Sequence, residues 1–297
     1  MSEPYYDILG PRAEMFLATL RDEVAELGGV MDPDGRSAAM PDGAGYNFDN
    51  LARSIPAGAS EQEIADGVRM FLGGLREAPN VRDYSWDELK MRLRTRLSAR
   101  VAMEGDETLV KPLAQDLMQT INVDFPNSVV TLTDRSTLAR LGVEPQQAMH
   151  IALINTAAEL SQADIEVHNV DGDVWALSSE SFFTSGLVIL LDEVLPLLLD
   201  REFDLDQGLL IAVPNRHVVL VGFLDAPGSL IAGVTTMTKV AMRLIRSQPG
   251  AISGSVYYSD RDGIQRIAHV DRDVDDERTV ILAPSERLQQ RMQSGEI

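Results

Sequence analysis

The sequence predicts an α+β fold of mixed helices and mainly antiparallel sheet. Segments with apolar residues at helical spacing are followed by short apolar segments of strand length, and this order recurs in the second half of the chain. Asp171-Gly172 and Asp262-Gly263 separate consecutive strand segments, as hairpin turns do. With 297 residues, of which 44% are hydrophobic, the chain is long enough to bury a sizeable core.

We expect two portions, an N-terminal α+β portion over residues 1–128 and a C-terminal portion over residues 129–297. The first helix is predicted over Pro11–Leu27, where apolar residues recur at helical spacing. Met31–Gly45 is rich in turn residues and leaves room for a short strand pair or a mobile loop. A second helix follows Ser60, which forms a capping box with Glu63.

A cationic strand is the most unusual feature of the N-terminal portion. Apolar and basic residues alternate over Leu89–Val101, which predicts a strand with one inward face. The other face would carry Lys90, Arg92, Arg94, Arg96 and Arg100. Like charges at this spacing repel, so either the protein's own carboxylates cover them or the strand is a protected sheet edge. Alternatively, the five cations form a docking strip for an acidic partner.

The C-terminal portion is predicted to repeat one unit, a helix followed by a hairpin. Helical segments are expected over 135–141 and 145–160 in the first unit, 181–199 in the second and 229–247 in the third, and hairpins over 164–177, 209–224 and 252–270. The helix of the second unit, 181–199, is apolar on nearly all sides, so we expect it inside the protein. The tail from Asp271 is acidic and then weakly helical.

Motifs that carry catalysis or bind cofactors are missing from the sequence. It has no Gly-x-Ser-x-Gly motif, no glycine-rich phosphate loop and no cysteine, and its four histidines are widely spaced. We therefore predict no catalytic residues, no metal site and no cofactor. An acidic cluster lacks the spacing of a calcium loop and indicates a solvated turn. Its members are Asp271, Asp273, Asp275, Asp276 and Glu277.

Two smaller features concern single polar residues. Pro214-Asn215-Arg216-His217 joins two apolar strands, and Pro and Asn are typical of a tight turn. Arg216 and His217 are nevertheless candidate anion-binding residues. Asn155 lies among apolar residues of a predicted helix, so we expect its amide to bond a neighbouring backbone.

Three stretches, each with its own short motif, resemble a known family. They are Asn47–Leu75 with Asn50-Leu51, Val129–Leu160 with Leu141-Gly142, and Gly208–Gly263 with Ile211-Ala212-Val213-Pro214. In this order they resemble the YtpQ-like family of bacterial proteins, a domain of unknown function. The resemblance implies a fold and a cytoplasmic bacterial origin, and it implies no chemistry.

Charge and hydropathy limit the function classes further. A net charge of −20 argues against a general nucleic-acid binder. The longest apolar run, Leu187–Leu199, contains Asp192, Glu193 and Pro196, so we expect no membrane span. The first ten residues lack the pattern of a signal peptide, which predicts a cytoplasmic protein.

The function predicted from these observations is non-catalytic. We expect a cytoplasmic protein-binding, adaptor or chaperone-like protein whose partner is another protein with acidic groups, bound at the cationic strand. One alternative is an enzyme, a hydrolase or nucleotide-dependent protein, with a site assembled from carboxylates and His217. Another is an oligomeric structural component. The sequence leaves the oligomeric state and the pathway open.

Overall fold

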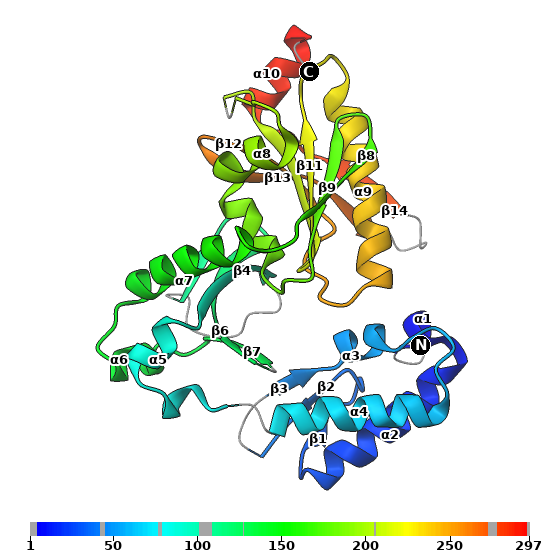
Figure 1. Ribbon diagram of the computed structural model, residues 1–297. Helices are drawn as coiled ribbons and strands as arrows, with labels where there is room; N and C mark the ends of the chain where they lie inside the picture. The colour runs from blue at the N-terminus through cyan, green and yellow to red at the C-terminus, as the bar shows by residue number, and fades with distance from the viewer. Residues whose placement is uncertain are drawn as a thin grey trace. The chain divides into compact units, whose positions relative to one another are not determined.

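The computed structural model describes residues 5–41, 45–76, 79–100, 109–126, 128–204, 206–272 and 278–295, and it confirms the α+β class (Figure 1). The chain forms two compact units. Unit 1 comprises residues 1–79, 126–128 and 246–251, and unit 2 comprises residues 80–125, 129–245 and 252–297. This division differs from the predicted boundary at residue 128. Residues 80–125 belong to unit 2 because Leu97 and Leu117 lie in the same core as the C-terminal hairpins.

Unit 1 combines four α-helices and the 3-10 helix η1 (Gly10–Arg12) with a small antiparallel sheet in its described residues. The helices are α1 (Tyr6–Leu9), α2 (Ala13–Glu26), α3 (Asp49–Ser54) and α4 (Glu61–Arg76). The strands β1 (Val30–Met31), β2 (Ser37–Ala39) and β3 (Gly45–Asn47) pair in the order β1-β2-β3. Of the two alternatives left open for Met31–Gly45, a strand pair or a mobile loop, the structure shows strands, because β2 pairs with β1 and with β3.

Helices α2 and α4 form the core of unit 1. Ile64, Val68 and Leu72 recur every four residues on α4, and all three are buried in one cluster with Phe16 and Leu20 of α2. The predicted capping box at the start of α4 is confirmed. The Ser60 backbone N–H donates to the carboxylate of Glu63 at 2.7 Å, and the Glu63 N–H donates to Ser60 Oγ at 3.3 Å.

Unit 2 begins with a small sheet and its covering helix. Its first elements are the 3-10 helix η2 (Val81–Asp83), α5 (Trp86–Lys90), β4 (Leu93–Ala99), β5 (Val110–Pro112), β6 (Leu117–Phe125), β7 (Ser128–Thr131), α6 (Ser136–Arg140) and α7 (Pro145–Leu160). The strand order is β4-β6-β5, and β7 also pairs with β6. Among the described strands β4 pairs with β6 alone, so its other edge needs partners from elsewhere.

The rest of unit 2 consists of helices and hairpins in the predicted alternation. The elements are β8 (Glu166–Asp171), β9 (Val174–Ser178), the 3-10 helix η5 (Thr184–Ile189), α8 (Leu191–Leu199), β10 (Leu209–Asn215), β11 (Val218–Phe223), α9 (Ser229–Ser247), β12 (Val256–Asp260), β13 (Gly263–Arg272), β14 (Arg278–Leu282) and α10 (Glu286–Ser294). In the described residues the strands form one antiparallel sheet of seven, in the order β14-β13-β12-β10-β11-β9-β8.

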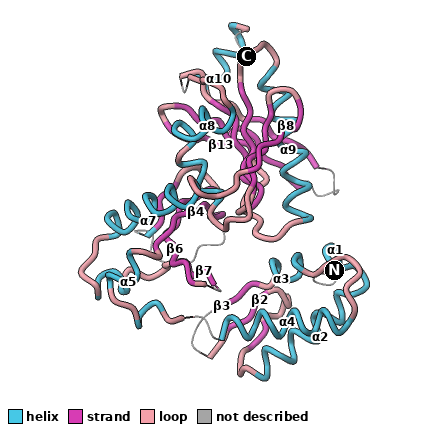
Figure 2. Tube along the Cα trace, in the orientation of Figure 1, coloured by secondary structure: helices cyan, strands magenta, loops and turns pink. Residues whose placement is uncertain are grey.

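Helices cover both faces of this large sheet (Figures 1 and 2). On β10, Ile211 and Val213 belong to the cluster that contains Leu187 of η5 and Leu191 and Leu195 of α8. Leu210 and Ala212 point to the other face and belong to the cluster that contains residues of α9 and α10. Double coverage explains why β10 and β11 are continuous apolar runs without alternation.

Some expectations for unit 2 are wrong in detail. The segment 181–199 is not one buried helix, because η5 is followed by α8, on which the Leu197 side chain is 83% exposed. Strands β6 and β14 are absent from the sequence-based assignment. In the described part of the chain, no helix is both long enough and apolar enough to span a membrane.

A polar network around Asp116 joins the small sheet to the large one within unit 2. Asp116 precedes β6, and its carboxylate accepts hydrogen bonds from Ser253 Oγ at 3.1 Å, Ser255 Oγ at 2.8 Å and the Tyr257 hydroxyl at 3.1 Å. Arg266 of β13 lies 3.6 Å away as its ion-pair partner. Burial raises the pKa of Tyr257 far above its ordinary value, so the phenol remains a donor.

We predict that Asp116→Ala lowers the free energy of unfolding by about 2–4 kcal/mol, because three buried donors lose a charged acceptor. Urea unfolding followed by circular dichroism measures the change. Asp164→Ala is the matched control, since Asp164 is exposed in the loop before β8, and it should stay within about 0.5 kcal/mol of the unmodified protein. Equal stability of the two variants would contradict a structural role for the network.

Candidate anion-binding site

The candidate site is built on β4, whose unpaired edge is satisfied by side chains. The Thr95 N–H donates to Thr156 Oγ1 of α7 at 2.8 Å, and the Leu97 N–H donates to Ser185 Oγ of η5 at 3.1 Å. Asn155 Nδ2 donates to the Leu93 carbonyl at 3.0 Å, as expected for this amide. These contacts replace a missing strand and fix β4 against α7 and η5.

The five predicted cations do not share one strand face. Lys90 ends helix α5, Arg92 lies in the turn before β4, and Arg100 follows the strand. Only Arg94 and Arg96 lie within β4. The alternation of apolar and basic residues begins at Leu89, four residues before β4. Leu89 is buried, but it belongs to helix α5 and not to the strand.

Several of the cations already have partners in the protein. Lys90 Nζ lies 2.6 Å from Asp87 within the same helix, and the Arg92 guanidinium lies 5.7 Å from the centre of the Phe125 ring. The Arg100 side chain is exposed, while its backbone N–H donates to the Asp116 carbonyl at 3.1 Å.

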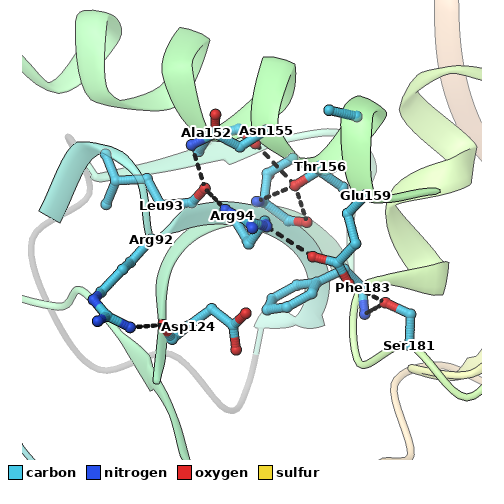
Figure 3. Close-up of polar contacts among 12 residues, drawn as sticks. Arg92, Leu93, Arg94, Asp124, Ala152, Asn155, Thr156, Glu159, Ser181 and Phe183 are labelled. Atoms are coloured by element: carbon cyan, nitrogen blue, oxygen red, sulfur yellow. Dashed lines mark hydrogen bonds and ion pairs between the residues drawn. The ribbon is translucent and has the colours of Figure 1, made fainter. Parts of the chain in front are cut away.

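Arg94 is held most firmly (Figure 3). Its Nε donates to Glu159 of α7 at 2.7 Å, and Nη1 donates to the carbonyls of Met91 and Leu93, each at 3.0 Å. The other oxygen of Glu159 accepts from Ser181 Oγ at 2.7 Å. The Arg94 side chain is only 18% exposed. The interpretation that the protein's own carboxylates cover the cations therefore holds for Arg94.

Arg96 is in a different situation. Its side chain is partly buried, and Nη2 lies 3.4 Å from Thr131 Oγ1 of β7. Thr131 in turn donates to the buried Asn122 of β6 at 2.8 Å. Among the described residues, no carboxylate forms an ion pair with Arg96. Burial, together with the charge of Arg216, lowers the pKa of Arg96 to about 10, which leaves it charged at neutral pH.

Arg216 comes from the turn between β10 and β11, and its position is set by two neighbours. Its Nε donates to His217 Nε2 at 2.9 Å, and its guanidinium lies 4.3 Å from the centre of the Phe182 ring. No carboxylate of the described residues forms an ion pair with it. Burial lowers the pKa of Arg216. The turn itself is the predicted one, because Asn215 Oδ1 accepts from the His217 N–H at 2.9 Å.

The contacts of His217 define its tautomer. His217 Nδ1 lies 3.2 Å from the Ser179 carbonyl, which can only accept, so Nδ1 carries the proton and Nε2 is free to accept from Arg216. Burial and the charge of Arg216 lower the pKa of His217, whereas Glu180 opposes the shift. His217 is therefore neutral at pH 7 and serves to orient Arg216.

Ser185 brings the two arginines together. Its Oγ accepts from the N–H of Leu97, the residue after Arg96, and its own N–H donates to the Arg216 carbonyl at 3.1 Å. One residue of η5 thus links β4 to the β10–β11 turn. We call Arg96 and Arg216 the arginine pair. The two candidate groups predicted separately, the cationic strand and the turn, meet here.

The arginine pair is electrostatically incomplete within the described part of the chain. Removing a cation from water is costly unless an anion compensates, and the two positive charges also repel each other. The protein has 46 acidic residues and 26 basic ones, yet the described carboxylates pair with neither arginine. Such an arrangement can bind an anion from outside, because guanidinium groups bind carboxylates and phosphates through paired N–H donors.

Two other features of the sequence can be compared with the described residues. The described residues contain no group of three or more His, Asp or Glu side chains that could hold a metal ion. Most of the acidic cluster after Val270 lies outside the described residues. Sequence reasoning missed Phe182, Thr131 and Ser185, which surround or link the arginine pair. A hydroxyl or an aromatic ring far away in the sequence gives no signal of such a contact.

Comparisons of the chain with protein-family models, with curated proteins and with solved structures find no match. Membership of the YtpQ-like family therefore stays a prediction.

We predict that Thr156→Val lowers the free energy of unfolding by about 1–3 kcal/mol, because the buried Thr95 N–H loses its acceptor. Thr235→Val is the matched control. Thr156 Oγ1 also donates to the Ala152 carbonyl of its own helix at 2.8 Å, and Thr235 Oγ1 makes the equivalent bond to the Ile231 carbonyl at 2.7 Å. Thr235, however, is exposed on α9. Urea unfolding of both variants compares them, and equal losses would show that the contact with β4 contributes nothing.

We predict opposite effects on stability for the two arginines of β4. Arg96→Met should raise the free energy of unfolding by about 1–3 kcal/mol in a buffer free of polyvalent anions, because an uncompensated charge is removed. Arg94→Met should lower it by about 1–2 kcal/mol, because Glu159 loses its partner. Chemical denaturation measures both, and a loss of stability in both variants would contradict the contrast.

Proposed function

We propose that this protein is a non-catalytic binding protein, adaptor- or chaperone-like, that captures a partner protein through an acidic group. The arginine pair is the binding site. The single observation that carries the proposal is that Arg96 and Arg216, whose segments Ser185 joins, are both partly buried and have no carboxylate partner among the described residues. A cytoplasmic location and membership of the YtpQ-like family belong to the same proposal.

The surroundings of the arginine pair support binding of a protein segment. Phe182 is 43% exposed, and one face of its ring is occupied by the Arg216 guanidinium. An aromatic side chain that is half accessible next to a cation gives a partner both an apolar contact and a charged one. The cations that were predicted with Arg96 contribute less, because Lys90 and Arg94 are held by Asp87 and Glu159.

The site is also held in a fixed geometry. Arg216 is oriented by His217 and Phe182, and Arg96 lies on a strand whose edge is bonded by Thr156 and Ser185. A side chain that is already ordered loses less conformational entropy on binding. A pre-organised arginine pair can therefore contribute more to affinity than flexible surface cations do.

We predict that Arg96→Glu abolishes partner capture without lowering the melting temperature, since the new carboxylate faces Arg216 and compensates its charge. The measurement is affinity purification from a nuclease-treated lysate, with quantitative mass spectrometry and a thermal melt of each purified variant. A partner enriched by the unmodified protein should fall at least tenfold with Arg96→Glu.

Arg21→Glu is the matched control, because Arg21 is exposed on α2 in unit 1 and the substitution changes the net charge equally. It should retain the partner. If both variants lose the partner to the same extent, the effect comes from net charge rather than from the arginine pair. If Arg96→Glu retains it, the proposed site is wrong.

A further inference from the structure

The arginine pair offers more hydrogen-bond donors than its described surroundings use. A guanidinium group carries five N–H donors. Arg216 uses Nε for His217, and Arg96 directs Nη2 toward Thr131. Among the described residues, the Nη groups of Arg216 and the remaining nitrogens of Arg96 have no hydrogen-bond acceptor from a side chain. Both guanidinium groups therefore have N–H donors that the described side chains do not use.

The charge of the pair selects among acidic ligands. Two guanidinium groups that repel each other carry a charge of about +2, which a carboxylate neutralises only by half. A phosphate monoester carries about −1.5 to −2 at pH 7 and has three terminal oxygens. One such group can accept paired N–H donors from both arginines at once, which a carboxylate with two oxygens cannot do as well.

Phe182 and His217 fit this ligand as well. The Arg216 guanidinium lies over the Phe182 ring, so its donors point outward in the plane of the group. His217 accepts from Nε and so leaves both Nη groups for the ligand. His217 is neutral and adds no charge to the site. Glu180 is a carboxylate whose charge acts on His217, so its one negative charge stands against the two positive charges of Arg96 and Arg216, and the sum stays positive.

We propose that the arginine pair binds a phosphate monoester, so that the partner is recognised through a phosphorylated side chain. This inference rests on the proposed function and narrows it, because it names the acidic group. The geometry points to one phosphate held between Arg96 and Arg216, with Phe182 in contact with the residue that carries it.

The test titrates the full-length ¹⁵N-labelled protein with small probes and follows the arginine Nε–Hε signals by NMR. The probes are amide-capped phosphoserine, amide-capped aspartate and inorganic phosphate, all at pH 7.5. We expect capped phosphoserine to bind at least tenfold more tightly than capped aspartate and to shift the signals of both Arg96 and Arg216. Arg96→Met and Arg216→Met should each weaken this binding at least tenfold, whereas Arg21→Glu should leave it unchanged.

Lowering the pH provides a second readout that needs no variant. The second proton of a phosphate monoester binds near pH 6, so phosphoserine affinity should fall several-fold between pH 7.5 and pH 5.5. Inorganic sulfate remains a dianion over this range and should bind with little change. A sulfate affinity that falls in parallel would assign the pH effect to the protein and contradict the inference.

The outcomes separate this inference from the proposed function. Equal affinity for capped aspartate and capped phosphoserine overturns the phosphate inference, and the acidic-partner proposal stands. Binding of inorganic phosphate but not of capped phosphoserine also overturns it, because the site would then take the free ion rather than a protein side chain. If no probe shifts the Arg96 and Arg216 signals, the inference is wrong, and partner capture with Arg96→Glu decides separately whether the proposed function is wrong too.

Discussion

The bonding of the free edge of β4 is the constraint on which the rest of unit 2 depends. A strand that pairs on one side only leaves backbone N–H and carbonyl groups that must find partners once they are buried. Here Thr156 and Asn155 of α7 and Ser185 of η5 supply these partners. The same contacts hold α7 and η5 in place, and η5 packs into the core on one face of the large sheet.

Placement of the cations follows from this arrangement. Because α7 lies along β4, Arg94 meets Glu159, and their charges compensate. Because Ser185 bonds both the Leu97 N–H and the Arg216 carbonyl, the part of β4 that carries Arg96 lies next to the turn between β10 and β11. One arginine of the strand is thus neutralised within the fold, whereas its neighbour meets a second arginine.

The sequence predicted those parts that depend on local patterns. Helix-plus-hairpin units, the Ser60–Glu63 capping box and the Asn215 turn are all visible as spacing or turn chemistry, and the structure confirms them. Strand β6 was missed because Met118 and Gln119 interrupt the alternation that runs through Ile121, Val123 and Phe125, and Gln119 is a buried polar residue. The buried Thr120 and Asn122 also bond to other segments, Thr120 to the Arg96 carbonyl and Asn122 to Thr131, and no local pattern in the sequence indicates these contacts.

For the candidate site, the sequence predicted the two arginines as candidate residues, but it did not predict that they lie near each other in the fold. Arg96 and Arg216 were each singled out from their own segments, as part of a charged strand and as part of a turn. Their proximity arises from tertiary packing through Ser185, and sequence spacing carries no information about it. The prediction of a strip of five cations failed for a local reason, because α5 extends through Lys90 and a turn precedes β4.

The central claim is that Arg96 and Arg216 repel each other in the folded protein and have no counter-ion among the described residues. A double-mutant cycle on stability measures this interaction, using the unmodified protein, Arg96→Met, Arg216→Met and the double variant at low salt without polyvalent anions. The account predicts an unfavourable coupling of about 0.5–1 kcal/mol or more, because removing either charge relieves the other. A coupling of zero, or a favourable one, would show that the two charges are separated or already compensated and would contradict the account.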